Sequence, residues 1–352
     1  MESNLDRQNI IDGIVKHPGV VVIVGDTDTG KTTLARQIIE KGTEAGLSTA
    51  IVDADMGQSE IGPPGAISMA TIDHFPESFK TLHPRRMYFT GSTTPVGHML
   101  PTVIGTRRMV DEATARGAGL IVVDTSGLVK GAIGRDLKLY KIDLISPPYI
   151  IGLAKSRELD PILSVLSRIE KYKVYKLPVS AEVKTKQKEF RAARRQAQFH
   201  GYFQNASRHF IRLDDIVCSD TYFTTGRPVK WQHFRVLEKD LNVRVLHAEV
   251  VDKGMYIVVD RKPEAGGVEA LMKRYGTRDF TVVCGSDFTN LLVGLADANN
   301  NIIDLGIIEA IDFKQRHIAV VTPATTITPV RIVQFGYMRV RPDGIELGKI
   351  KL

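Results

Sequence analysis

The chain has 352 residues, of which 43% are hydrophobic and 25% are charged, and its formal net charge is +7 at pH 7. This length allows two domains with their own cores, and the composition excludes a disordered or fibrous chain. Two cysteines, Cys218 and Cys284, are too few for a disulfide framework or a zinc cluster and favour a reducing compartment. The sequence shows no signal peptide or membrane span, so we expect a cytoplasmic protein. The positive charge favours a polyanionic partner without identifying one.

The first half of the chain alternates between strand-like and helix-like patterns. A short helix is expected over residues 4–16. Short apolar runs then predict strands at residues 20–24, 49–52, 87–89, 120–123 and 149–153. Helical spacing lies between or after them, at residues 33–40, 103–116 and 160–171. Such alternation predicts an α/β fold, a parallel sheet with helices on both faces, whose ligands bind at the carboxyl ends of the strands.

The second half has a different residue pattern, with a basic segment followed mainly by strand-like runs. A basic, helix-permissive segment covers residues 184–198 and includes Lys184, Lys186 and Lys188. Beyond it, strands are expected at residues 246–260, 279–284, 291–297, 302–311 and 317–321. We therefore expect a P-loop domain over residues 1–224, including a lid segment at about 180–203, and a smaller β-rich domain over residues 225–352. Trp231, near the expected junction, is interpreted as a packing residue.

One motif indicates what the first domain binds. Residues 25–32 read GDTDTGKT, a complete G-x-x-x-x-G-K-[ST] loop between a strand and a helix. In this setting backbone N–H groups and the positive end of the helix face one spot, which suits phosphate oxygens. Lys31 is expected to reach the β- and γ-phosphates of ATP or another nucleoside triphosphate, and the Thr32 hydroxyl is expected to ligate Mg²⁺. The predicted nucleotide-binding residues are Gly25, Asp26, Thr27, Asp28, Thr29, Gly30, Lys31, Thr32 and Thr33.

Carboxylates follow two of the predicted strands. Asp53 and Asp55 are two residues apart, so they point the same way on an extended segment. At the end of a strand they can face the γ-phosphate, where one supports Mg²⁺ and the other accepts a proton from an attacking hydroxyl. A turn that uses Asp and Gly for backbone reasons fits the same residues equally well.

Asp124 ends an apolar run and is followed by Thr125, Ser126 and Gly127, which suggests a metal-supporting carboxylate and resembles the D-x-x-G turn of GTPases. A GTPase also needs an Asn-Lys-x-Asp or Thr-Lys-x-Asp motif after a later strand. The nearest string, residues 140–143, lies in a helical pattern, and we interpret it as a helix surface.

The basic segment supplies Arg191, Arg194 and Arg195. Phosphoryl transfer places negative charge on equatorial oxygens, which an arginine from a mobile segment can neutralise. Arg191 and Arg195 are four residues apart and share one helix face, so this helix could close over the phosphates as a lid. A solvated basic helix is the alternative.

Five motifs occur in a fixed order: GDTDTGKTT (25–33), DADMGQ (53–58), FTGSTTP (89–95), DTSGLVKG (124–131) and FRAARRQAQFHGYF (190–203). Together they resemble the polynucleotide 5′-hydroxyl kinase family, which includes RNA kinases of tRNA splicing, pre-mRNA 3′-end cleavage and ribosomal-RNA processing. The resemblance covers over half of the chain. The β-rich tail is also similar to the C-terminal domain of archaeal members.

The resemblance implies roles for individual residues. Asp55 matches the proposed general base on the 5′-hydroxyl, and Lys31, Arg191 and Arg195 match the other catalytic positions. Thr32, Asp53 and Asp124 would form the metal site. The residues expected near the nucleic-acid acceptor are Gln58, Ser92, Thr93, Thr94, Thr125 and Gly127.

Two departures from the family pattern stand out. Leu128 occupies a position where eukaryotic members commonly have Trp, which puts substrate positioning in question. Only a short helical leader precedes the phosphate loop, so the chain resembles a prokaryotic member without an N-terminal β domain, and strict adenine selectivity is not assumed.

The leading hypothesis is an ATP- and Mg²⁺-dependent kinase that phosphorylates the 5′-hydroxyl end of RNA or DNA. An ATP-binding, non-catalytic scaffold of an RNA-processing complex is the alternative, and a GTPase or assembly ATPase is a third possibility that the missing base-reading motif disfavours.

Overall fold

The computed structural model describes residues 2–180, 187–252, 254–264, 266–276 and 279–350. The chain divides into two compact units, Met1–Gln198 (unit 1) and Phe199–Leu352 (unit 2). The expected boundary after residue 224 therefore falls inside unit 2. The reason is strand pairing, because β8 (Ser207–Arg212) pairs with β16 (His317–Thr322), and β9 (Val217–Ser219) pairs with β17 (Ile332–Val340).

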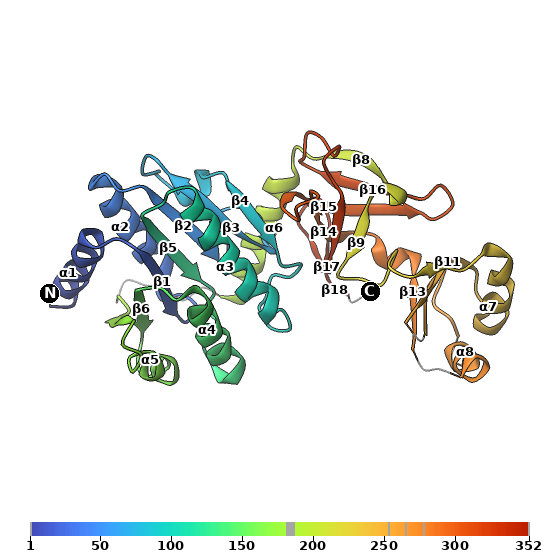
Figure 1. The fold of residues 1–352 in the computed structure, drawn as a ribbon, viewed down its shortest axis with the longest axis horizontal. Helices are drawn as coiled ribbons and strands as arrows, with labels where there is room; N and C mark the ends of the chain where they lie inside the picture. Colours follow the sequence, from blue (N-terminus) through green and yellow to red (C-terminus); the bar gives the residue numbers. More distant parts are fainter. Residues whose placement is uncertain (1, 181–186, 253, 265, 277–278, 351–352) are drawn as a thin grey trace. The chain divides into compact units, whose positions relative to one another are not determined.

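Unit 1 is built on a seven-stranded sheet of order β4-β3-β2-β5-β1-β6-β7 (Figure 1). Strands β2, β5, β1, β6 and β7 run parallel to one another, whereas β3 pairs antiparallel with both β2 and β4. The strands are β1 (Val20–Gly25), β2 (Thr49–Ala54), β3 (Ala66–Ile72), β4 (Arg86–Phe89), β5 (Leu120–Thr125), β6 (Tyr149–Ala154) and β7 (Lys173–Pro178). The predicted strands are confirmed, but β3 and β7 were not predicted.

Helices cover both faces of this sheet, as expected. Alternate residues of β1 enter separate cores: Val22 and Val24 pack in one, and Val21 and Ile23 in the other. The first core takes side chains from α3 (Met99–Ala115), α4 (Gly131–Ile145) and α5 (Asp160–Leu166). The second takes side chains from α1 (Glu2–Lys16), α2 (Lys31–Glu44) and η1 (Phe79–Thr81). The carboxyl ends of β1, β2 and β5 therefore meet at one edge of a rigid, two-sided core.

Unit 2 contains two sheets. One has seven strands, in the order β18-β17-β14-β15-β16-β8 with β9 beside β17, and the other has the order β10-β11-β12-β13. Phe223, Phe288 and Phe335, together with Tyr256 of β12, pack in a shared core. The strands not yet given are β10 (Arg227–Pro228), β11 (Val245–Val251), β12 (Gly254–Val259), β13 (Phe280–Cys284), β14 (Leu291–Ala296), β15 (Ile302–Asp312) and β18 (Glu346–Lys349).

The expected β-rich character of the second unit is confirmed, with two differences. The single run predicted over residues 246–260 forms two antiparallel strands, β11 and β12. Helices also belong to this unit: η2 (Leu213–Asp215), η3 (Trp231–His233), α7 (Phe234–Leu241), α8 (Gly267–Tyr275) and η4 (Gly285–Phe288). Helix α8 connects β12 to β13, which pair in parallel. Within the described part of the chain, no helix has both the length and the apolarity needed to cross a membrane.

Candidate active site

The phosphate-binding loop connects β1 to α2 (Figure 1), as the sequence predicted. Asp28 and Gly30 have φ angles of 54° and 84°, in the left-handed region, so the chain turns sharply before the helix. Helix α2 begins at Lys31, whose Nζ donates a hydrogen bond to the carbonyl oxygen of Asp26 at 2.7 Å. The loop thus curls around the lysine, and the helix N-terminus faces the space that phosphates would fill.

A cavity of about 800 Å³ opens beside this loop, within the usual size range of ligand sites. Residues 27–33 line it together with Asp55, Gln58 and Asp124, all of which were predicted from the sequence. Glu60 and Arg194 also line it. Glu60 was not predicted from the sequence, and Arg194 was predicted only as part of the basic segment, with no role of its own. Every residue that lines this cavity belongs to unit 1.

Asp124 and Thr32 meet at the floor of the cavity. Thr32 Oγ1 donates a hydrogen bond to Asp124 Oδ2 at 2.5 Å, while Asp124 Oδ1 is buried and has no hydrogen-bond partner among the described residues. Burial raises the pKa of Asp124 to about 6, and the charge of Lys31 opposes that shift. Hydroxyl and carboxylate oxygens are ligands that Mg²⁺ accepts alongside phosphate oxygens. The unpartnered oxygen beside Thr32 therefore fits a magnesium ion.

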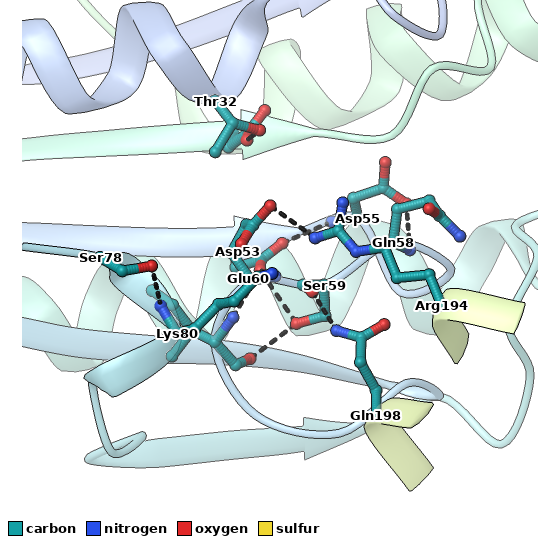
Figure 2. A network of polar contacts seen from close by, with 12 residues as sticks. Thr32, Asp53, Asp55, Gln58, Ser59, Glu60, Ser78, Lys80, Arg194 and Gln198 are labelled. Atoms are coloured by element: carbon teal, nitrogen blue, oxygen red, sulfur yellow. Dashed lines mark hydrogen bonds and ion pairs between the residues drawn. The ribbon is translucent and has the colours of Figure 1, made fainter. Parts of the chain in front are cut away.

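Asp53 holds the loop that carries Asp55 (Figure 2). Its Oδ2 accepts hydrogen bonds from Ser59 Oγ at 2.9 Å and from the N–H groups of Glu60 and Ile61 at 2.5 and 3.0 Å. Its Oδ1 accepts a bond from the N–H of Asp55 at 3.1 Å. Burial raises the pKa of Asp53 to about 7, and two neighbouring carboxylates add to that shift. Because four hydrogen-bond donors bind the carboxylate of Asp53, this residue stabilises the loop. Its predicted role in a metal site stays a prediction.

Asp55 presents one oxygen that the protein does not use. Its Oδ1 accepts hydrogen bonds from the N–H groups of Gly57 at 3.2 Å and Gln58 at 3.1 Å. No donor among the described residues bonds to Oδ2, and Asp55 lines the cavity. A Cβ added at Gly57 would lie 2.5 Å from the carbonyl oxygen of Thr93, so only glycine allows the 89–95 segment to approach this closely. The turn therefore fixes the carboxylate while leaving one oxygen for a substrate.

Helix α6 (Lys188–Phe203) is fastened to the same loop, and Figure 2 shows its side chains reaching it. Arg194 and Glu60 form an ion pair at 2.5 Å, and Gln198 Nε2 donates to the carbonyl oxygen of Ser59. Gln58 Nε2 donates to the carbonyl oxygen of Arg191 at 3.3 Å. The lining of the cavity includes Arg194, whereas the predicted pair was Arg191 and Arg195.

Part of the expected lid cannot be compared with the structure. Residues 181–186, with Lys184 and Lys186, lie outside the described part of the chain, as does the side chain of Lys188. The described helix that follows them bonds to the loop of Asp55 through Arg191 and Arg194, and its action as a lid stays a prediction.

Several residues predicted near the acceptor are used within the protein. Ser92 is buried, and its hydroxyl bonds to the carbonyl and N–H groups of Thr94 at 3.2 and 3.3 Å. Thr125 is fully buried and donates to the carbonyl oxygen of Ile23 at 2.7 Å. These two hydroxyls therefore hold their own loops in place. Thr93 and Thr94 are half-buried, and Gln58 reaches the cavity.

Gly127 packs directly against the phosphate loop. A Cβ at this position would lie 2.6 Å from the backbone nitrogen of Thr27 and 2.7 Å from its Cα. Both are backbone atoms that cannot rotate away, so the residue must be glycine for the loop to keep its shape. The observed contact of Gly127 is thus with the nucleotide side of the site.

Two buried lysines lie beneath this carboxylate cluster, on α4. Lys138 Nζ donates to Thr125 Oγ1 at 2.9 Å and to the carbonyl oxygen of Ser126 at 2.5 Å. Lys141 Nζ is buried with no hydrogen-bond partner among the described residues. Burial lowers the pKa of both amines, to about 8 for Lys141, and the charge of Asp55 opposes the shift in each case.

Residues 140–143 lie in a helix, as predicted. The prediction that they form its surface is wrong for Lys141. Tyr140 is exposed, but Lys141 is fully buried. The signal was present in the sequence, because Leu137, Lys138, Lys141 and Ile142 recur at the spacing of one helix face. The charge of Lys141 favours an exposed position, but its place on the apolar face of the helix correctly indicates burial.

The family model for the P-loop of the mRNA cleavage and polyadenylation factor CLP1 matches residues 25–205, just over half of the chain. The chain belongs to this family. Curated relatives extend over nearly the whole length. The polyribonucleotide 5′-hydroxyl-kinase of Pyrococcus furiosus is 33% identical over 334 residues, which cover 95% of this chain and 91% of the relative. The enzyme of the same name from Methanocaldococcus jannaschii is 34% identical over 337 residues, covering 94% and 90%.

Other matches cover a shorter part of the chain or show the fold alone. The CLP1 homolog of Arabidopsis thaliana is 29% identical over 199 residues, covering 53% of this chain and 44% of its own. Among solved structures, the wild-type Clp1p–Pcf11p complex superimposes with a TM-score of 0.62 at 13% identity, covering 95% of this chain and 78% of the other. This match shows a common architecture. The predicted family and the predicted P-loop fold class are therefore both confirmed.

Proposed function

We propose that this member of the CLP1 family is a polynucleotide kinase that uses ATP and Mg²⁺ to phosphorylate the 5′-hydroxyl end of RNA or DNA. The observation that carries the proposal is that Asp55, whose Oδ2 receives no hydrogen bond from the described residues, lines the same cavity as the phosphate loop and the Thr32–Asp124 pair. The full-length relatives named polyribonucleotide 5′-hydroxyl-kinase support RNA as the acceptor.

Each group around the cavity has a task in this reaction. Lys31 and the N–H groups of the loop hold the triphosphate, and Thr32 with Asp124 would hold Mg²⁺. Bound there, the ion would offset charge on the phosphate oxygens. Asp55 accepts the proton of the 5′-hydroxyl as that oxygen bonds to the γ-phosphorus, and the bond from phosphorus to the β-phosphate oxygen breaks, releasing ADP.

The arginines of α6 complete the proposal. Arg194 already lies at the cavity through its ion pair with Glu60. We keep Arg191 and Arg195 as groups that neutralise the transferring phosphoryl, and add Arg194 as a third. For the acceptor strand we retain Gln58, Thr93 and Thr94, whose side chains are at least partly accessible. A cytoplasmic location is part of the proposal and is supported by the free thiols of Cys218 and Cys284.

The test is transfer of labelled γ-phosphate to a 5′-hydroxyl oligoribonucleotide, compared with the same oligomer as DNA. Asp55→Asn should reduce transfer by about a hundredfold or more, the usual effect of losing a general base, while ATP affinity stays near that of the wild type. Asp143→Asn, at an exposed position of α4, is the matched control and should transfer normally. Undiminished transfer by Asp55→Asn would contradict the base assignment, and tight ATP binding with no transfer to any end would favour a scaffold.

A further inference from the structure

Unit 2 carries an aromatic side chain that faces solvent instead of a core. Trp231 is 74% exposed. The expectation that it packs inside the protein is therefore wrong. Tryptophan is enriched at binding interfaces, because its ring is apolar and its N–H can donate a hydrogen bond.

The surroundings of Trp231 form a regular stripe. Helix η3 continues into α7, because His233 and Phe234 at their junction both have right-handed helical backbone angles. Side chains four residues apart share a face in such a segment, so Trp231, Arg235 and Lys239 lie in one row, and all are exposed. The other face holds Leu237 and Leu241, which are buried in the core beside β11 and β12.

The stripe is positively charged. Residues 221–237 contain three cations, Arg227, Lys230 and Arg235, and no Asp or Glu. None of these three, nor Lys239, forms an ion pair with another residue that the structure describes.

The two carboxylates of α7 are engaged elsewhere. Glu238 Oε1 accepts a hydrogen bond from the N–H of Val245 at 3.0 Å, and Asp240 pairs with Arg274 at 2.5 Å. Along with Arg274, the charge of Lys239 also helps to lower the pKa of Asp240, but neither carboxylate forms an ion pair with the stripe, so its cations remain able to bind an external anion.

We propose that the stripe Trp231–Arg235–Lys239, with Lys230, binds single-stranded RNA outside the catalytic cavity. Proteins that hold single strands combine an aromatic face for a base with cations for the phosphates, and this stripe offers both within two helical turns. A helix that docks a protein would instead repeat apolar residues at these positions. The choice of RNA rests on the proposed function, since a polynucleotide is the substrate class of that reaction.

The protein offers a direct probe, because Trp231 is its single tryptophan. We would titrate the intact protein, without ATP, with an oligouridylate of about 12 nucleotides, within the range of known single-strand sites. A 5′-phosphate on the RNA prevents it from acting as a kinase acceptor. Stacking predicts saturable quenching of the tryptophan emission that weakens as salt is added. A polyglutamate peptide of equal length should quench little, and equal quenching by the peptide would overturn the choice of RNA.

Charge reversal separates this stripe from general basicity. The double variant Arg235→Glu/Lys239→Glu should lower RNA affinity and reduce the dependence of log affinity on log salt by about 1.4, the value for two phosphate contacts on a single strand. Lys314→Glu/Lys349→Glu alters two exposed lysines of the same unit by the same charge and should bind like the wild type. Trp231→Ala, followed by anisotropy of labelled RNA, should bind about tenfold more weakly.

Kinase assays give an independent readout. With an oligoribonucleotide acceptor that carries a 5′-hydroxyl, the KM of the stripe variants should rise while kcat is unchanged. The fluorescence titration needs no phosphoryl transfer, so it tests the stripe even if the kinase proposal fails. Absence of quenching, or equal RNA affinity of the stripe and control variants, would overturn the inference.

Discussion

Replacing the buried Lys141 by methionine should make the protein more stable at neutral pH. Burial lowers the pKa of this amine from its ordinary value of 10.5 to about 8, so at pH 7 the group is charged in an environment that disfavours the charge. The difference between those values corresponds to about 3 kcal/mol of unfavourable free energy for the folded state. Methionine has a similar length without a charge, so Lys141→Met should raise the free energy of unfolding by about that amount.

The stability difference between Lys141→Met and the wild type should depend on pH. Between about pH 8 and pH 10.5 the unfolded chain holds a proton on Lys141 that the folded chain has released, so wild-type stability from this group rises with pH through that window. The gap between variant and wild type should therefore be about 3 kcal/mol at pH 7 and close towards pH 10.5. Burial and the charge of Lys141 both lower the pKa of Lys138, so removing Lys141 also relieves Lys138 and acts in the same stabilising direction.

Urea unfolding without nucleotide measures the stability difference between Lys141→Met and the wild type. We would carry it out at about pH 7, 8.5 and 10, values chosen around the folded and unfolded pKa of Lys141. Nucleotide is left out because a ligand of the folded state would add its own stabilisation. Lys155→Met, at an exposed position, is the matched control and should change stability by less than about 0.5 kcal/mol at every pH. A gap that stays constant with pH, or a less stable Lys141→Met, would refute the account of a buried ammonium that destabilises the folded state. Since Lys141 adds positive charge near Asp55, we also expect the stabilised variant to transfer phosphate more slowly.

Three further predictions concern the loops around the cavity. Gly127→Ala should weaken ATP binding about tenfold in calorimetry, because its Cβ would displace the backbone of Thr27, whereas Gly13→Ala, which meets open space, should bind normally. The Mg²⁺ concentration needed for half-maximal activity should rise as pH falls below about 6, since protons then compete for Asp124; a pH-independent requirement would exclude it as a ligand. Asp53→Ala should lower the free energy of unfolding by about 3 kcal/mol or more, because four donors lose their acceptor. A loss below about 1 kcal/mol would show that water replaces the carboxylate.

Much of unit 1 was predictable because its information is local. Buried parallel strands are short apolar runs, and the phosphate loop is a continuous octet whose glycines and lysine have fixed tasks. The order of motifs then placed Asp55 and Asp124 at neighbouring strand ends, where the structure finds them. Strand β3 was not predicted because it is an additional antiparallel strand, which the regular alternation of strands and helices does not require.

By itself, then, the sequence determined the α/β core, the nucleotide loop and the carboxylates at its edge. Only the tertiary structure decided which side of a helix each polar residue occupies. Arg194 was chosen as the cavity arginine by its pairing with Glu60, a contact between residues 134 apart in the chain. Lys141 lies in the core and Trp231 in solvent, each opposite to its chemical preference. Such placements depend on what packs against a residue from elsewhere in the chain, and no local pattern of charge or hydrophobicity encodes that neighbour.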